Sequence, residues 1–252
     1  MDGIERRFLD GLPVDQVGLE RAVSVCLAAA DGEAGEPLRV ITLNPEMVMR
    51  ARKDDALARS FAGSTLVVAD GAGIIAAGRL RGWRGITRVP GIELCERLIA
   101  EASARGLPVF FYGGEPGVAE TAAANLRRRY PGLTVAGTAH GYLPEAEAEA
   151  LPARIAATRA RLLFVALGAG RQEAWLARHL EAAGARVGMG VGGSLDVFAG
   201  RTRRAPALFR RLGLEWAYRL ARQPSRWRRL LVLPGFVLLA LLPGTGRRRR
   251  VK

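Results

Sequence analysis

The sequence predicts an α/β protein with a Rossmann-like, mainly parallel sheet of about six strands, helices on both faces and a helical, basic C-terminal appendage. Three observations support this class. Short apolar runs that end in turn residues alternate with longer segments of helical spacing, which is typical of β-α-β units. Polar residues directly follow several of these runs, where parallel strands bring them to one edge of a sheet. The excess positive charge is confined to the last fifth of the chain.

The apolar runs are short and are bounded by residues that favour turns, so each is expected to be a strand. The expected strands cover residues 38–43, 65–69, 108–112, 133–136, 162–167 and 186–191. The expected helices cover residues 17–30, 72–80, 91–105, a stretch between 117 and 130, 145–159 and a segment that begins near 168. Such connections imply right-handed crossovers and a sheet covered on both faces. The basic, glycine-rich residues 79–90 are expected to form a loop or a small hairpin.

The composition is that of a globular protein. With 252 residues, 49% of them apolar and 25% charged, the chain can form one large or two small domains. Cys26 and Cys95 lie in apolar helical patterns and outside any C-x-x-C pair, so we expect reduced core residues and no disulfide or zinc framework. The first seven residues lack the apolar core of a signal peptide, which predicts a cytoplasmic protein.

The charge is distributed unevenly along the chain. Residues 201–252 contain fifteen Lys or Arg and one acid, which gives +14, whereas residues 1–200 contain 23 basic and 23 acidic residues and are neutral. This asymmetry predicts a catalytic domain over residues 1–200 and a basic, membrane-associating appendage over residues 201–252. An anionic membrane surface or a nucleic acid would suit such an appendage.

Two glycine-rich loops follow expected strands, at residues 113–117 and 168–170. Neither completes the G-x-G-x-x-G dinucleotide fingerprint, and the chain has no Walker lysine. Tight turns explain these glycines as well as phosphate binding does, and Glu115 would repel a phosphate. An NAD-dependent redox enzyme is therefore poorly supported, and we expect no cofactor.

Polar side chains stand at the ends of the expected strands. They are Thr42, Asn44, Asp70, Tyr142, Gln172, Glu173 and Asp196. Each alone is most simply a turn or helix-cap residue. Residues so far apart in sequence meet at one edge of a parallel sheet, and their joint placement predicts a shared site there.

A series of short motifs runs through the chain in a fixed order. They are Thr42-Leu43-Asn44-Pro45-Glu46, Ala69-Asp70-Gly71-Ala72-Gly73, Arg88-Val89-Pro90-Gly91, Gly113-Gly114, Tyr130-Pro131-Gly132, His140-Gly141-Tyr142, residues 168–173, residues 192–196, Arg204-Ala205-Pro206, residues 213–220 and residues 224–229. In this order they resemble the TagA/WecG/CpsF family of bacterial glycosyltransferases, from about residue 38 to residue 229. The chain departs from the family pattern at Gly170-Arg171, where Pro-Lys is usual, and at Leu43, where proline is common.

The resemblance implies an inverting, metal-independent transfer of a sugar, typically N-acetylmannosamine or its uronic acid. The donor is a UDP-sugar and the acceptor an undecaprenyl-diphosphate-linked amino sugar at the cytoplasmic membrane face, in wall or surface polysaccharide synthesis. Asp70 falls at the family's general-base position, and the resemblance places four polar active-site residues at Thr42, Asn44, Arg88 and Gln172. Substrate contacts are expected at Tyr142, Asp196, Gly113, Gly114, Arg219, Arg226 and Arg229, the last three on an appendage that closes over the donor diphosphate.

These residue types fit the chemistry. Inverting transfer needs a base to take the proton of the acceptor hydroxyl, which Asp70 supplies, and an electrophile for the departing diphosphate. Arg88 and the appendage arginines provide the second through charge-assisted bonds, and the absence of an Asp-x-Asp pair agrees with a site that holds no metal.

The apolar run at residues 230–242 is too short to span a membrane. Thirteen helical residues at about 1.5 Å each do not cross a core of about 30 Å. We expect it to lie in the interface, with arginines on anionic headgroups, so that the protein is peripheral on the inner face of the plasma membrane. A nucleic-acid-binding α/β protein is the alternative, although the tail interleaves arginines with aliphatic rather than aromatic residues. A homo-oligomer is possible, and the sequence does not decide it.

Overall fold

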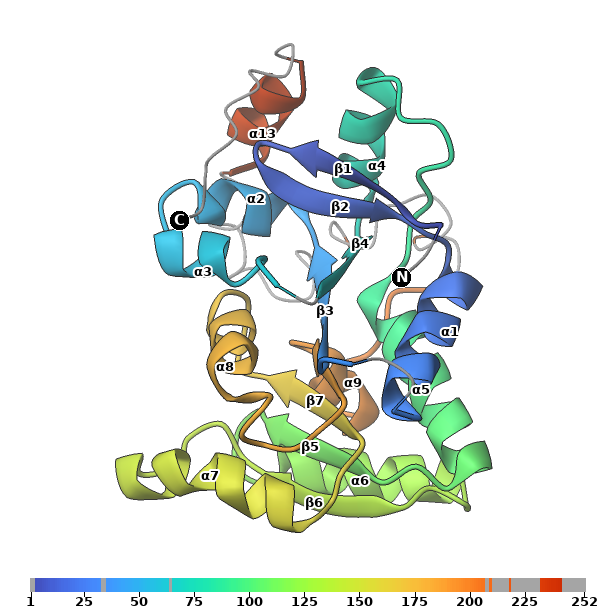
Figure 1. The fold of residues 1–252 in the computed structure, drawn as a ribbon, viewed down its shortest axis with the longest axis vertical. Coiled ribbons are helices and arrows are strands. Elements are labelled where there is room, and N and C mark those ends of the chain that lie inside the picture. The colour runs from blue at the N-terminus through green and yellow to red at the C-terminus, as the bar shows by residue number, and fades with distance from the viewer. Residues whose placement is uncertain are drawn as a thin grey trace.

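The computed structural model describes residues 3–32, 35–63, 65–206, 209, 218 and 232–241. Within them lie a six-stranded parallel sheet and a separate two-stranded antiparallel hairpin (Figure 1). The strands are β1 (Glu5–Leu9), β2 (Leu12–Gln16), β3 (Leu38–Leu43), β4 (Thr65–Ala69), β5 (Val109–Gly113), β6 (Val135–Ala139), β7 (Leu162–Ala166) and β8 (Val187–Gly190). The helices are α1 (Leu19–Ala30), α2 (Pro45–Ala51), α3 (Asp55–Arg59), α4 (Ala72–Leu80), α5 (Gly91–Arg105), α6 (Val118–Arg129), α7 (Glu145–Ala157), α8 (Arg171–His179), α9 (Ser194–Phe198) and α13 (Val232–Leu241).

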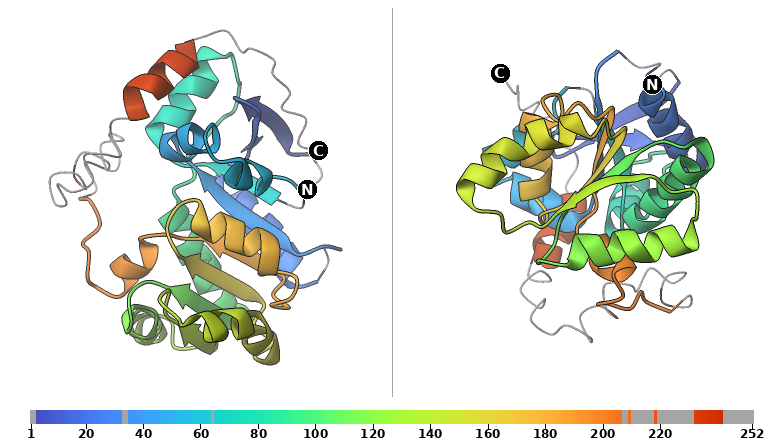
Figure 2. Two further views of the ribbon diagram at one scale, coloured as in Figure 1. Left: turned by 90° about the vertical axis from the view of Figure 1, so that its left-hand side faces the viewer. Right: turned by 90° about the horizontal axis from the view of Figure 1, so that it is seen from below.

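The large sheet has the strand order β4-β3-β8-β7-β5-β6, and its strands are paired in parallel throughout. Alternate side chains of each strand enter different layers, as the pleat requires. Val40 of β3 joins the cluster beneath α1, α5 and α6, whereas its neighbour Ile41 joins the cluster beneath α2 and α4. A third cluster lies between β5, β7, α7 and α8. The expected Rossmann-like sheet with helices on both faces is confirmed, and Figure 2 shows both layers.

Most expected elements agree with the structure within one or two residues, but the fourth strand is shifted. We expected it at residues 133–136, whereas β6 covers Val135–Ala139. Leu133 supplied the apolar start of the predicted run, yet its N–H donates to the Tyr130 carbonyl oxygen across 2.9 Å and its side chain is buried. Leu133 therefore belongs to the turn that precedes the strand. The basic segment after α4 forms a loop rather than a hairpin.

The β1–β2 hairpin, α2 and α3 were missing from the predicted elements. The hairpin turns at Asp10-Gly11, where both residues have positive φ. Such a dipeptide is a strong hairpin signal, but the flanking residues are too polar to show a clear alternation. The two short helices begin at side-chain caps, because Asn44 Oδ1 accepts from Met47 N and Asp54 Oδ1 accepts from Leu57 N, each across 3.0 Å.

The hairpin closes one edge of the large sheet through an ion pair between the buried Asp15 and the half-buried Arg6. Asp15, which is 3% exposed, accepts from Arg6 Nε across 2.7 Å and from the backbone N–H of Val67 in β4 across 2.8 Å. Arg6 Nη2 in turn donates to the Thr65 carbonyl oxygen across 2.6 Å. Two side chains thus satisfy backbone groups of β4 that face away from β3.

Replacing Asp15 with Asn should lower the free energy of unfolding by about 2 to 3 kcal/mol. The amide keeps one acceptor oxygen but turns an NH₂ group toward the Arg6 guanidinium or the Val67 N–H, so that one buried donor loses its partner. Urea unfolding measures the change. Asp54→Asn is the control, because Asn caps a helix as well as Asp does and should cost less than about 0.5 kcal/mol. Equal losses in the two variants would contradict the role given to the Asp15 bonds.

Helix α13 folds back onto the body of the protein. Its Phe236, Leu239 and Ala240 are buried in the cluster formed with α2 and α4, and Arg81 Nη2 donates to the Leu239 carbonyl oxygen across 3.0 Å. Pro234 lies in the first helical turn, where a missing N–H is tolerated. Figure 1 shows α13 beside α2 and α4, at the end of the molecule that carries the hairpin. None of the helices in the described part of the chain is long and apolar enough to span a bilayer.

Candidate active site

Every strand of the large sheet runs in the same direction, so the residues that follow the strands gather at its carboxyl edge. Apart from Arg88, which lies in the loop before α5, the predicted site residues that the structure describes lie at this edge, at the ends of strands, in loops or in the first turns of helices. In the strand order from β4 to β6, they are Asp70, Thr42 with Asn44, Asp196, Gln172, Gly113 with Gly114, and Tyr142. Arg219, Arg226 and Arg229 lie outside the described residues.

Asp70 stands at the start of this edge, between β4 and α5. Its N–H donates to the Leu43 carbonyl oxygen across 2.8 Å, and its Oδ2 accepts from Gly91 N, the first residue of α5, across 3.2 Å. A carboxylate at a helix N-terminus is favoured by the N–H groups that point toward it. The backbone therefore holds this carboxylate at the carboxyl edge of the sheet, where it is partly exposed.

Thr42 and Arg88 lie close to Asp70. A Cβ placed on Gly91 would be 2.9 Å from the Thr42 methyl group, so α5 begins directly against the Thr42 side chain. The Val89 N–H donates to the Ala69 carbonyl oxygen across 2.9 Å, which aligns the segment carrying Arg88 with the end of β4. The structure thus brings the Asp70 carboxylate, the Thr42 side chain and the backbone of the segment that carries Arg88 to one corner of the edge.

One atom of the Asn44 side chain, Oδ1, has a structural role. It caps α2 through the bond from Met47 N, so the group directed elsewhere is the amide NH₂. Asp196 lies in the first turn of α9, where its backbone carbonyl oxygen accepts from the N–H groups of Arg201 and Thr202. Both residues are half-buried.

The backbone of the Gly113-Gly114 turn packs closely against the backbone of Ala166. Gly113 has φ of 122°, and a Cβ there would lie 2.5 Å from the carbonyl carbon of Ala166 in the neighbouring strand. The Gly114 N–H donates to the Ala166 carbonyl oxygen across 3.0 Å, and the Gly114 carbonyl accepts from Gly141 N across 2.8 Å. This chain of bonds places the segment carrying Tyr142, which is 67% exposed, beside the turn.

Gln172 and Glu173, at the start of α8, are buried and are not exposed at the carboxyl edge. Gln172 Nε2 donates to Glu173 Oε1 across 2.8 Å, and Gln172 Oε1 accepts from Gly192 N across 3.1 Å. Burial raises the pKa of Glu173, while its hydrogen bonds and the Arg50 guanidinium act in the opposite direction. Glu173 was expected at this edge with the other polar residues, but the sequence analysis gave it no catalytic or binding role.

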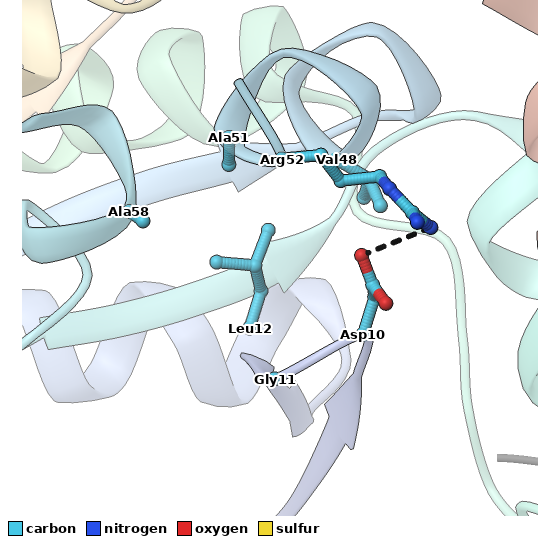
Figure 3. A pocket seen from close by; sticks show the side chains of 7 residues that line it. All are labelled: Asp10, Gly11, Leu12, Val48, Ala51, Arg52 and Ala58. Carbon is cyan, nitrogen blue, oxygen red and sulfur yellow. Dashed lines mark ion pairs between the residues drawn. The ribbon is translucent and has the colours of Figure 1, made fainter. Parts of the chain in front are cut away.

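Two hollows elsewhere do not coincide with this edge. One, between the hairpin tip and α2, is lined by Asp10, Leu12 and Arg52 among others (Figure 3). Its volume of about 30 Å³ suits one water molecule. The other, of about 320 Å³, lies between α5, α6 and α9. Asp70 lines neither of them.

The parallel sheet and the polar corner at its carboxyl edge define an α/β protein of the kind that binds its ligand where the strands end. A family model described as the glycosyl transferase WecG/TagA/CpsF family matches residues 7–250. The chain belongs to this family and is a glycosyltransferase.

Three curated relatives carry the name N-acetylglucosaminyldiphosphoundecaprenol N-acetyl-beta-D-mannosaminyltransferase. The protein of Bacillus spizizenii is 34% identical over 202 residues, which are 80% of this chain and 78% of the relative. That of Bacillus subtilis is 33% identical over 202 residues, with the same shares. That of Staphylococcus aureus is 36% identical over 200 residues, 79% of this chain and 78% of the relative.

Proposed function

We propose that this protein transfers N-acetylmannosamine, or a related amino sugar or uronic acid, from a UDP-sugar to an undecaprenyl-diphosphate-linked sugar in wall or surface polysaccharide synthesis. The observation that carries the proposal is the corner of Asp70, Thr42 and Arg88 at the carboxyl edge of the sheet. The names of the three relatives support the donor sugar and the acceptor.

In the proposed reaction Asp70 acts as general base. Its carboxylate takes the proton of the acceptor hydroxyl as that oxygen attacks the anomeric carbon from the face opposite to the leaving UDP, so the configuration inverts. The bond from the anomeric carbon to the diphosphate breaks, and the negative charge that develops there is stabilised by Arg88 and by the appendage arginines without a metal. Thr42, beside Asp70, is placed to hydrogen-bond the acceptor sugar.

The nucleotide end of the donor is proposed to lie farther along the edge, at Gly113, Gly114, Tyr142 and Asp196. Four strand spacings of about 4.8 Å separate β4 from β5, which is roughly 19 Å. A ligand that contacts both Asp70 and the Gly113 turn must therefore be extended, as a nucleoside diphosphate sugar is. The exposed ring of Tyr142 offers an aromatic face to the base.

A UDP-release assay across a panel of UDP-sugars, with and without a lipid-linked amino-sugar acceptor, tests the proposal. We expect release that requires acceptor, is fastest with UDP-N-acetylmannosamine or its uronic acid, and continues in EDTA. Product anomers are resolved by NMR. UDP release without acceptor would contradict the proposed acceptor. Retention of configuration would contradict the inverting mechanism, and a strict need for added Mg²⁺ would contradict metal independence. A DNA-binding titration in parallel tests the nucleic-acid alternative.

The outer face of α13 supports a membrane contact on the inner face of the plasma membrane. Val237, Leu238 and Leu241 are 54%, 61% and 62% exposed, and Leu80 at the end of α4 is 64% exposed. These residues belong to α13 and α4, which lie side by side at one end of the molecule (Figure 2). A lipid surface would cover them, and the basic residues that follow at 247–250 would meet anionic headgroups.

Replacing Leu238 with Asp should weaken binding to anionic liposomes about tenfold, because a charge enters the apolar interface. Flotation with vesicles that contain phosphatidylglycerol measures the effect. Ala150→Asp, on the exposed surface of α7, is the matched control and should float like the unchanged protein. Equal flotation of the Leu238 variant would show that this face does not enter the bilayer.

A further inference from the structure

Two neighbouring polar side chains are buried behind the carboxyl edge, where the proposed chemistry does not use them. Glu173 is 2% exposed and Gln172 is 5% exposed. An ionised carboxylate inside a protein is costly unless N–H groups satisfy its oxygens. Both oxygens of Glu173 are satisfied, because Oε2 accepts from Gly170 N across 2.6 Å and Oε1 accepts from Gln172 Nε2 across 2.8 Å.

The Gln172 amide continues this chain of bonds to a second loop, since its Oε1 accepts from Gly192 N across 3.1 Å. The direction of the three bonds fixes the orientation of the amide. If the amide were reversed, its oxygen would face the Glu173 carboxylate and its NH₂ would face the Gly192 N–H. The network therefore requires one acceptor-only group and one group that both donates and accepts at positions 172 and 173; in this chain Glu173 is the first and Gln172 the second.

Hydrogen bonds and a nearby cation partly offset the burial of Glu173. Burial raises the pKa of this carboxyl, whereas the two hydrogen bonds and the nearby Arg50 oppose that shift. Arg50, on α2, also donates from Nη1 to the Ala169 carbonyl oxygen across 2.6 Å. The loop after β7 is thus held from two directions, by Arg50 from α2 and by Glu173 from within α8.

The two loops joined in this way occupy the middle of the edge. They follow β7 and β8, and these strands lie between β3, which leads to Thr42, and β5, which leads to the Gly113 turn. We propose that Gln172 and Glu173 are positioning residues, which hold the two loops together and set the distance between the base and the nucleotide, without touching substrate. The catalytic effect of this pair rests on the proposed function, but its structural coupling does not.

Single substitutions should break the network in different ways. Glu173→Gln places an NH₂ group against either the Gly170 N–H or the Gln172 NH₂, and Gln172→Glu places two carboxylates face to face. Each should lower kcat roughly tenfold to a hundredfold, with a smaller change in KM for the donor, because the loops shift while individual substrate contacts remain.

The double variant Gln172→Glu with Glu173→Gln, which exchanges the two side chains, is the decisive one. The new amide at position 173 would accept from Gly170 N and donate to the new carboxylate at position 172, which would also accept from Gly192 N. All three bonds are restored with the same total charge. We expect this double variant to recover most of the kcat and of the unfolding free energy lost in the single variants.

Urea unfolding of the four proteins gives a coupling that is independent of catalysis, and transfer assays give kcat and KM. Glu147→Gln on the exposed surface of α7 is the control and should change neither. The proposal is overturned if Glu173→Gln alone keeps full transfer, or if the double variant unfolds no later than the single ones. Recovery of stability without kcat would also overturn it, by showing that the Gln172 amide acts on substrate. If the unchanged protein transfers no sugar, the proposed function fails, while the unfolding cycle still decides whether the pair is coupled.

Discussion

The Asp70→Asn variant is expected to transfer sugar about 10²- to 10⁴-fold more slowly than the unchanged protein, with nearly the same UDP affinity and unfolding midpoint. An amide at this position keeps an oxygen that can accept from Gly91 N, so the start of α5 stays in place. It cannot take the proton of the acceptor hydroxyl. The loss should therefore appear in kcat, because binding of the donor does not depend on that proton.

Single-turnover transfer, calorimetric titration with UDP and a thermal melt together separate chemistry from binding and folding. Asp31→Asn, at the end of α1, removes a surface carboxylate that pairs with Arg105 and serves as the control, for which we expect unchanged transfer. Transfer by the Asp70 variant at the rate of the control would remove Asp70 from the role of base. A parallel fall in UDP affinity would instead place Asp70 on the donor side.

Gly113→Ala should lower the free energy of unfolding by about 4 kcal/mol, enough to leave much of the protein unfolded. Two costs combine at this position. The φ of 122° is strained for any residue with a side chain, and the added methyl would lie 2.5 Å from the carbonyl carbon and 2.8 Å from the Cα of Ala166. Either β5 or β7 must move, and the hydrogen bond from Gly114 N to Ala166 moves with it.

Gly117→Ala provides a matched comparison in the same loop. Gly117 also has a positive φ, of 84°, but a Cβ there meets nothing within 4 Å. The comparison variant should therefore lose only about 1 kcal/mol in urea unfolding. Similar losses at the two positions would mean that backbone conformation, and not the approach to β7, makes glycine necessary at 113.

Most of the sheet could be predicted because β4, β5, β7 and β8 are buried on both faces, which leaves apolar runs in the sequence. Helices α4 and α5 begin and end at the expected residues, and Gly106 ends α5 in the left-handed conformation. The hairpin was missed because β1 exposes most of its residues, and α2 and α3 because seven and five residues are too few to show helical spacing.

The site was predictable only as a location. Parallel strands guarantee that residues after them share an edge, and this places Thr42, Asp70 and Tyr142 correctly relative to the sheet. The parallel arrangement does not tell which side chains are exposed at that edge. Gln172 lies at the expected edge, but the bond between its amide and Gly192, twenty residues later, depends on a loop geometry that no local pattern encodes.

The way in which the hairpin meets β4 also bears on self-association. An edge strand with free N–H and C=O groups is a template for a strand of another molecule, and long exposed edges are sites of aggregation. On β4 the Thr65 carbonyl oxygen accepts from Arg6 and the Val67 N–H donates to Asp15. These backbone groups are therefore not available to pair with a strand of another molecule. The β1–β2 hairpin thus protects the catalytic sheet from intermolecular pairing at this edge, so removing the hairpin would favour aggregation even where the active-site corner is left intact.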